Sequence, residues 1–161
     1  MRRIAGLVVV FFGVAALSQE AAQLVYVPQK DVEERIRKAP ANSIGEQELN
    51  LIERTPDHAG ILLRRVLPGK AEVHATETDI WYVIDGGCIL VTGGAVIDPK
   101  PEGTGQIRGT GITGGTEWTL SKGDFMRIPN GMPHWIKKIN DGELVYTVVK
   151  YTEPKDAPQK Q

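Results

Sequence analysis

The sequence predicts an all-β protein built as a sandwich or a barrel. Short runs rich in valine, isoleucine, threonine and aromatic residues follow one another from about Leu49 onward, and glycine, proline and aspartate separate most of them. The 161 residues match the size of one domain, which is long enough to bury a core without a disulfide. The runs expected to form strands are 60–67, 71–76, 79–84, 88–93, 116–120, 124–129, 134–139 and 144–151.

The first 18 residues have the organisation of a secretory signal peptide. A positively charged start, Met1 to Arg3, precedes the apolar run 4–17, and Ala16 and Ser18 supply small residues before a cleavage point. We expect cleavage after Ser18, a periplasmic or secreted protein, and no stable membrane anchor afterwards. The apolar run is shorter than the roughly 20 residues that a membrane-spanning helix needs.

The rest of the chain divides into three parts by composition. Residues 19–48 form an N-terminal segment with one short helix expected at 28–38, where acidic residues come early and basic residues late, as the helix dipole favours. Residues 49–152 form the predicted barrel, and the polar residues 153–161 a flexible tail. Inside the barrel, the glycine-rich stretch 93–115 is expected to be a long flexible or hairpin excursion, either a lid or a spacer.

The charge of the sequence argues against a nucleic-acid-binding protein, and its cysteine content argues against a fold held by disulfides. The formal net charge is -1 and the charged residues are interspersed, so we expect no nucleic-acid partner. The single cysteine, Cys88, has no second cysteine with which to form an intramolecular disulfide, so the fold must be held by its core even in an oxidising compartment.

The three histidines provide the first chemical signal. His74 lies in a strand-like run in which Glu72, His74 and Thr76 share one face, because side chains two residues apart point the same way. His134 follows the stretch "GDFMRIPNGMPHW" (123–135), in which prolines and glycines predict a tight turn that fixes the direction of the imidazole. Imidazoles and carboxylates brought together have the composition of a metal site. His58, in a turn-rich segment, is expected to be exposed.

Two stretches resemble the conserved motifs of the cupin superfamily. Residues 123–134 match the second motif, Gly-x5-Pro-x-Gly-x2-His, with His134 as its histidine. The first motif, Gly-x5-His-x-His-x3–4-Glu-x6-Gly, is matched in order by Glu72, His74, Asp79 and Gly86. Together the motifs cover about residues 69–139. The resemblance implies a cupin barrel, that is, a double-stranded β-helix or jelly roll.

The sequence departs from the first motif at two ligand positions. Glu72 stands where a histidine is usual, and Asp79 where a glutamate is usual. A shifted register would make His74 the first histidine and Thr76 the second, but it leaves too few residues before Asp79. The preferred register therefore keeps Glu72 and His74.

The resemblance implies a divalent transition metal, Mn, Fe, Ni or Zn, held by Glu72, His74, Asp79 and His134. Glu72 and Tyr146 are the candidate catalytic acids or bases. Arg65 and Arg127 are candidate ligands for an anionic substrate, although an exposed surface position is the preferred interpretation for each.

Two functions of different classes follow from the resemblance. The first is a metal-dependent enzyme, of dioxygenase, decarboxylase, isomerase or lyase type, acting on a small polar or carboxylate-bearing molecule. The second is a non-catalytic module that binds or senses a small ligand, because fold alone does not dictate activity. In either case the expected partner is a small molecule, with a homodimer also expected from the resemblance.

Overall fold

The computed structural model describes residues 24–38, 46–52 and 54–153. The predicted signal peptide lies outside these residues, as does the predicted tail except for Glu153. The described chain forms one helix, α1 (Gln29–Lys38), and eleven strands: β1 (Glu46–Ile52), β2 (His58–Arg65), β3 (Ala71–His74), β4 (Glu77–Thr92), β5 (Ala95–Ile97), β6 (Lys100–Pro101), β7 (Gln106–Gly109), β8 (Gly111–Thr113), β9 (Thr116–Ser121), β10 (Phe125–Ile128) and β11 (His134–Thr152).

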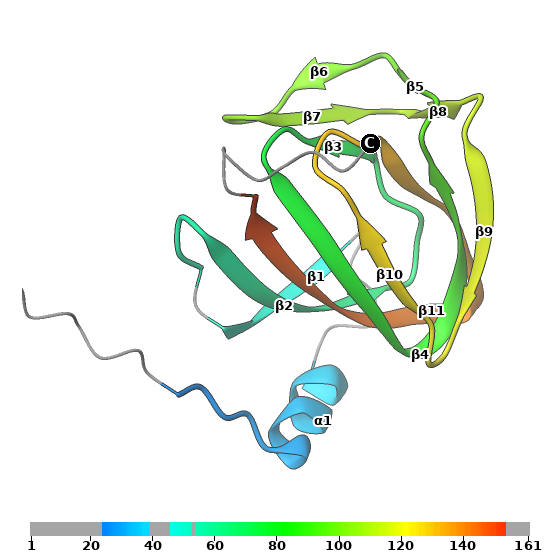
Figure 1. Ribbon diagram of the computed structural model, residues 1–161. Helices are drawn as coiled ribbons and strands as arrows, with labels where there is room; N and C mark the ends of the chain where they lie inside the picture. The colour runs from blue at the N-terminus through cyan, green and yellow to red at the C-terminus, as the bar shows by residue number, and fades with distance from the viewer. Residues whose placement is uncertain (1–23, 39–45, 53, 154–161) are drawn as a thin grey trace, which may run out of the picture.

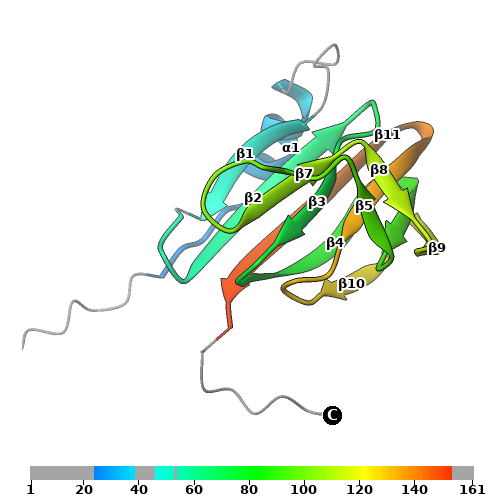
Figure 2. The ribbon, with the colours of Figure 1, turned by 90° about the horizontal axis from the view of Figure 1, so that it is seen from above.

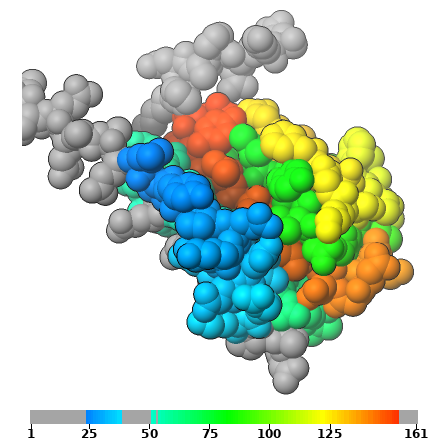
Figure 3. All heavy atoms as spheres, turned by 90° about the horizontal axis from the view of Figure 1, so that it is seen from below, coloured from blue at the N-terminus to red at the C-terminus, as the bar shows by residue number. Residues whose placement is uncertain are grey.

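The predicted helix is confirmed. Asp31 lies in the first turn of α1, while Arg35, Arg37 and Lys38 lie in the last, which places each charge at the favourable end of the helix dipole. No residue of α1 is buried. In Figure 3 the segment 24–38 lies on the outer surface of the barrel. Within the described residues, no helix has the length and apolar character needed to cross a bilayer.

The two longest strands of the barrel, β4 and β11, are antiparallel to each other, and β2, β3, β9 and β10 each pair with one of them (Figures 1 and 2). They pair along their whole length, from Thr92 opposite His134 to Glu77 opposite Thr152. Strand β10 pairs with the first part of β4 and β9 with its second part. The second half of β11 also pairs with β2, which in turn pairs with β1.

Each of these long strands joins two runs that the sequence analysis expected to be separate strands with a turn between them, 79–84 and 88–93 in β4 and 134–139 and 144–151 in β11. Gly86 lies inside β4 with a φ of 67°, and Asp141 and Gly142 lie inside β11 with φ values of 55° and 85°. The pairing of β4 with β11 shifts register between Asn140 and Leu144, opposite Gly86 and Gly87. The predicted turns at these glycines are therefore wrong: the glycines bend two continuous strands at a bulge instead.

The glycine-rich stretch forms nested hairpins. Strand β5 pairs with β8, and β6 pairs with β7, in both cases antiparallel. The hairpin part of the prediction is therefore correct. Strand β7 also pairs with β3, with Gln106 opposite His74 and Arg108 opposite Glu72. The stretch thus extends the sheet beside the candidate ligands, and its role as a lid or a spacer stays a prediction.

The core fills the inside of the barrel and explains where the polar site lies. Inward side chains alternate along each strand, so Tyr146 and Val148 of β11 share a face with Lys150, and Trp81 and Val83 of β4 share a face with Asp79. The apolar members of this core are Ala59, Ile61, Leu63, Trp81, Val83, Cys88, Leu90, Leu120, Ile128, Ile136, Leu144, Tyr146 and Val148. The same inward faces carry charged side chains toward one end of the barrel.

Candidate metal centre

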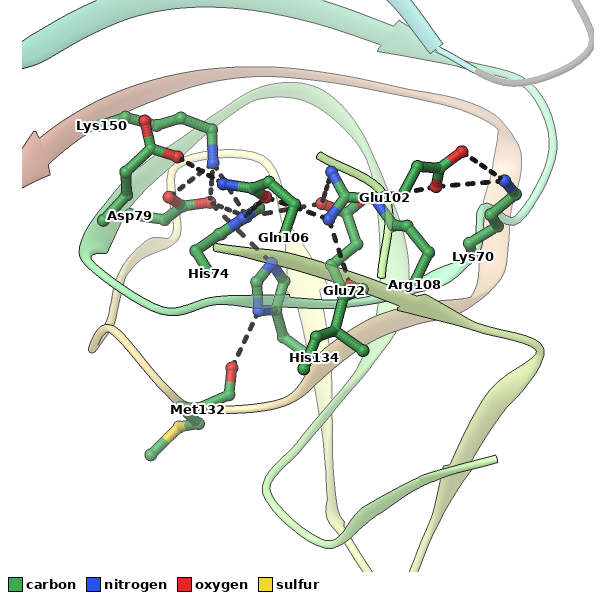
Figure 4. Close-up of polar contacts among 12 residues, drawn as sticks. Lys70, Glu72, His74, Asp79, Glu102, Gln106, Arg108, Met132, His134 and Lys150 are labelled. Carbon is green, nitrogen blue, oxygen red and sulfur yellow. Dashed lines mark hydrogen bonds and ion pairs between the residues drawn. The ribbon is translucent and has the colours of Figure 1, made fainter. Parts of the chain in front are cut away.

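The inward faces of β2, β3, β4, β7 and β11 line a cavity of about 440 Å³. Its polar wall is formed by residues from distant parts of the chain, as Figure 4 shows for Glu72, His74, Asp79, Arg108 and Lys150. Apolar side chains of the barrel core close its inner end, among them Leu63 and Val148. The cavity has the size of a small-molecule site.

Three of the four predicted metal ligands come together here. Glu72 and His74 lie on β3 and His134 begins β11, where it is paired directly with Glu72. One ligand atom from each of the three lies within 4.8 Å of the other two. Both imidazoles are almost completely buried, and their ring centroids are 5.0 Å apart. The three residues that the motifs nominate therefore lie together in the structure, and their role as metal ligands stays a prediction.

The predicted turn before His134 is present and is tied to His74. The amide of Met132 donates to the carbonyl of Pro129, which closes the turn, and Gly131 has a φ of 75°. The amide of Gly131 then donates to the carbonyl of His74 at 2.7 Å. One backbone hydrogen bond therefore fixes the position of the His134 turn relative to the other imidazole.

The hydrogen bonds of His134 set its tautomer. Nδ1 lies 3.1 Å from the carbonyl oxygen of Met132, and since a carbonyl only accepts, Nδ1 carries the proton and donates. Nε2 consequently presents a lone pair. It is a buried nitrogen without a hydrogen-bond partner among the described residues. Burial lowers the pKa of His134, and the negative charges of Glu72 and Asp79 raise it. Burial is the larger effect, so the pKa of His134 is below that of an exposed histidine.

His74 has the same tautomer for a different reason. Its Nδ1 faces Oε1 of Gln106, and the Gln106 amide is oriented because its Nε2 donates to Glu77 at 3.1 Å while its oxygen accepts from Arg108 at 3.2 Å. Nδ1 of His74 is therefore a donor and Nε2 an acceptor. That acceptor is used by Nζ of Lys150, 2.9 Å away.

Asp79, the fourth predicted ligand, lies at the edge of this group and has other partners. Its Oδ2 is 3.6 Å from Nε2 of His74 and 3.9 Å from Nε2 of His134. Both carboxylate oxygens accept from Nζ of Lys150, at 2.7 and 2.9 Å, and Trp81 donates at 3.3 Å. Burial raises the pKa of Asp79, but a hydrogen bond from His74 when its ring is protonated and the ammonium of Lys150 together outweigh burial, so the pKa of Asp79 lies well below its usual range.

Glu72 is surrounded by positive charge. Its oxygens lie 3.3 Å from Arg108 and 3.5 Å from Arg65. Burial raises the pKa of Glu72, while the charges of His134 when protonated, Arg108 and Arg65 lower it, and the net pKa is below that of an exposed glutamate. Glu72 is therefore an anionic oxygen donor at neutral pH.

The two arginines that the sequence analysis singled out lie in different places. Arg65 is 4% exposed, donates from Nε to the hydroxyl of Tyr146 at 3.0 Å and lines the cavity, so an exposed surface position was the wrong interpretation for it. Arg127 is exposed and pairs with Glu153 and Tyr151 away from the cavity, as expected. Tyr146, the other predicted catalytic residue, is buried against Trp81 and lines the cavity.

Sequence reasoning missed Lys150, Gln106 and Arg108. For Lys150 a signal existed, because it follows Tyr146 and Val148 at strand spacing and so falls on the inward face. For Gln106 and Arg108 the glycine-rich surroundings gave no such pattern. His58 is exposed and outside the cavity, as expected.

Comparison with known proteins shows the fold. No family model and no curated protein matches the sequence. Among solved structures, TT1209 from Thermus thermophilus is similar with a TM-score of 0.51 and 17% identity, over 74% of this chain and 95% of that one. The Cnp3 cupin domain of Schizosaccharomyces pombe has a TM-score of 0.50 and 12% identity, over 69% of this chain and 70% of that one.

A third structure gives the same result. An uncharacterized conserved protein with a double-stranded β-helix domain, from Klebsiella pneumoniae, has a TM-score of 0.50 and 19% identity, over 70% of this chain and 81% of that one. The chain therefore has the cupin fold, and the predicted double-stranded β-helix is confirmed.

The donor set fits a divalent transition metal. Two imidazole nitrogens and one carboxylate form a borderline set of ligands that suits Mn, Fe, Ni or Zn. The observation that supports this fit best is the buried Nε2 of His134, whose lone pair has no hydrogen-bond partner among the described residues and lies near the possible ligand atoms of Glu72 and His74. In both imidazoles the Nδ1–H group donates a hydrogen bond to an oxygen whose position is fixed. Metal-binding histidines usually have such a hydrogen bond on the nitrogen that does not bind the metal.

Proposed function

We propose that this protein is a metal-dependent enzyme that acts on a small carboxylate-bearing molecule. The observation that carries the proposal is the convergence of Glu72, His74 and His134 next to a cavity of about 440 Å³. Three protein ligands leave coordination positions for water or substrate. A divalent metal bound there would supply a Lewis acid that polarises a substrate oxygen or activates water.

The charge of the cavity supports an anionic substrate. Four cationic side chains line it together with three carboxylates, so the lining carries a net positive charge before any metal is counted. A bound divalent metal would add two more positive charges. The seven side chains are Arg54, Arg65, Arg108, Lys150, Glu72, Glu77 and Asp79. A small molecule carrying one or more carboxylates is the ligand class that this balance favours.

Arg65 and Tyr146 are placed to bind and orient such a ligand. Arg65 is held by Tyr146 on one side and Glu72 on the other, so its guanidinium has a fixed direction in the cavity. The Tyr146 hydroxyl accepts from Arg65, and Tyr146 lines the cavity, where its side chain can contact a substrate. Glu72, ionised at neutral pH, serves as a metal ligand or as a proton acceptor.

A non-catalytic binding module is the second candidate, and one observation favours it. Lys150 neutralises Asp79, and Arg65 and Arg108 neutralise Glu72, so both carboxylates have positive partners in a site without metal. A cavity of this kind can bind a small anion by charge alone. Absence of metal from the protein would favour this module over the enzyme.

The test is elemental analysis of the protein purified without chelator. The variants are the double substitution His74→Ala/His134→Ala and, as a matched control, His58→Ala, which removes an exposed imidazole outside the cavity. We expect near-stoichiometric metal in the wild type and in His58→Ala, and none in the double variant. Absence of metal from the wild type, even after incubation with Mn, Fe, Ni and Zn, would overturn the metalloenzyme proposal and favour the binding module.

We also propose that the protein is exported, on the basis of residues 1–18 of the sequence. The test is the intact mass of the protein recovered from its native host. A mature chain that starts at Gln19, outside the cytoplasm, is the expected result, and a chain that retains Met1–Ser18 in the cytoplasm would contradict it.

A further inference from the structure

Lys150 lies among the candidate metal ligands. Its ammonium is 2.9 Å from Nε2 of His74 and 2.7 and 2.9 Å from the two oxygens of Asp79, and its side chain is 12% exposed (Figure 4). Lys150 and Asp79 are directly opposite each other on β11 and β4. The backbone register therefore fixes the ammonium beside two of the four residues that the sequence motifs nominate as ligands.

Lys150 and a metal ion would need the same lone pair. Nδ1 of His74 donates to Gln106, so Nε2 has one lone pair in the plane of the ring. That lone pair accepts a hydrogen bond from Lys150 in this structure. A nitrogen with a single lone pair cannot accept a hydrogen bond and bind a metal at the same time.

We propose that Lys150 is an internal cation that competes with the metal for His74 and Asp79, so that the site alternates between a lysine-filled and a metal-filled state. This inference rests on the proposed metal-dependent function. In the lysine-filled state the ammonium bridges His74 and Asp79. In the metal-filled state Lys150 leaves Nε2 of His74 because two positive charges repel each other at this distance.

The surroundings allow this exchange. Lys150 lines the cavity, and because its four-carbon stem is flexible, the side chain can move into that space without a change in the backbone. Asp79 is then released from one of its partners and becomes available as a further metal ligand. His134 is unaffected, because its Nε2 makes no hydrogen bond to Lys150 or to any other described residue. The competition therefore concerns two of the four residues that the sequence motifs nominate as ligands, His74 and Asp79.

The test measures zinc affinity at one fixed pH by competition with a chromophoric chelator. The variants are Lys150→Met and Lys150→Gln, and the matched control is Lys138→Met, which removes an exposed lysine from the same strand. We expect zinc binding to tighten by about tenfold or more in both Lys150 variants, which is about 1.4 kcal/mol. Lys138→Met should bind zinc as the wild type does. Lys150→Arg, which keeps the positive charge, should show no such gain.

The possible results separate this inference from the proposed function. Equal or weaker zinc binding in the Lys150 variants, with clear binding in the wild type, would overturn the inference and leave the metal centre intact. No zinc binding in any variant would overturn the inference, and the elemental analysis after incubation with Mn, Fe, Ni and Zn decides the proposed function separately. Zinc binding only in the Lys150 variants would support the competition and show that the natural chain is not a zinc protein.

A measurement on the wild type covers the case in which the Lys150 variants do not fold. Acetylation of lysines by a succinimidyl ester is mapped by mass spectrometry with and without saturating zinc. Displacement of the ammonium from His74 and Asp79 should increase acetylation of Lys150 while that of Lys138 stays constant. Unchanged acetylation of Lys150 at saturating zinc would overturn the inference.

Discussion

The amide oxygen of Gln106 accepts a hydrogen bond from Nδ1 of His74. A residue of the glycine-rich stretch therefore orients a candidate metal ligand that lies 32 positions earlier in the chain. The amide itself is fixed by Glu77 and Arg108, so the orientation passes from these charged groups through Gln106 to the imidazole.

Replacing Gln106 by leucine is expected to weaken metal binding. The substitution removes the oxygen that holds the proton on Nδ1 of His74, and loss of such a partner costs about 10- to 100-fold in metal affinity. Zinc affinity measured by chelator competition checks this. Ile107→Ala, at the neighbouring exposed position of β7, is the control and should bind zinc normally. Unchanged affinity in Gln106→Leu would show that the hydrogen bond does not position the ligand.

Arg65 and Arg127 provide a matched pair for testing anion binding. Arg65→Met should abolish most of the rise in melting temperature that oxalate produces in the metal-free protein, because it removes the oriented guanidinium from the cavity. Arg127→Met should leave the rise intact, because Arg127 lies outside the cavity. A full oxalate effect in Arg65→Met would mean that the anion binds elsewhere.

Gly86 and Gly142 differ in what an added methyl group would meet. Both have positive φ, but a Cβ at Gly86 would overlap the carbonyl oxygen of Glu143, whereas one at Gly142 has no atom within 4 Å. Gly142→Ala should lower the free energy of unfolding by about 1–2 kcal/mol, the cost of the left-handed conformation. Gly86→Ala should lower it by more than about 3 kcal/mol or prevent folding, since backbone must move as well. Urea denaturation of both variants checks this, and equal losses would contradict the described bulge.

The thiol of Cys88 is expected to be unreactive in the folded protein. Burial raises the pKa of Cys88 to about 12, with the charge of Arg65 opposing this only in part, so almost no thiolate exists at pH 8. Reaction with iodoacetamide at pH 8 should be negligible under native conditions and complete in guanidinium chloride. The thiol is protonated in both states well below pH 9, so its contribution to stability is full there and declines as the pH rises through 9 toward 12. Rapid alkylation of the native protein would contradict the burial.

The parts of the fold and site that follow local rules could be predicted from the sequence. The turn at 129–131 has proline and glycine where their backbone preferences require them, and it delivers His134 as expected. The spacing of Glu72 and His74 on one strand puts both on the same face. Each of these predictions needs only residues that are near one another in sequence.

The parts of the fold and site that depend on pairing between distant strands could not be predicted from the sequence. Glycines at Gly86 and Gly142 have the same local signature in a turn and in a bent strand, and only the pairing of β4 with β11 makes them bends. Lys150 meets Asp79 because of the register between strands that are 71 residues apart at this point. Gln106 reaches His74 only because β7 pairs with β3. No local pattern contains this information.

The residues of the site lie on β3, β4 and the last strand, β11, and this has a consequence for when the site forms during folding. Glu72, His74 and Asp79 lie on strands from the middle of the chain, whereas His134 and Lys150 lie on β11, whose pairing with β3 and β4 brings them to the site. Pairings this distant in sequence form late and slowly. The metal centre that we propose would therefore be completed after the barrel closes. With the export that we also propose, the ion would come from the compartment in which folding ends.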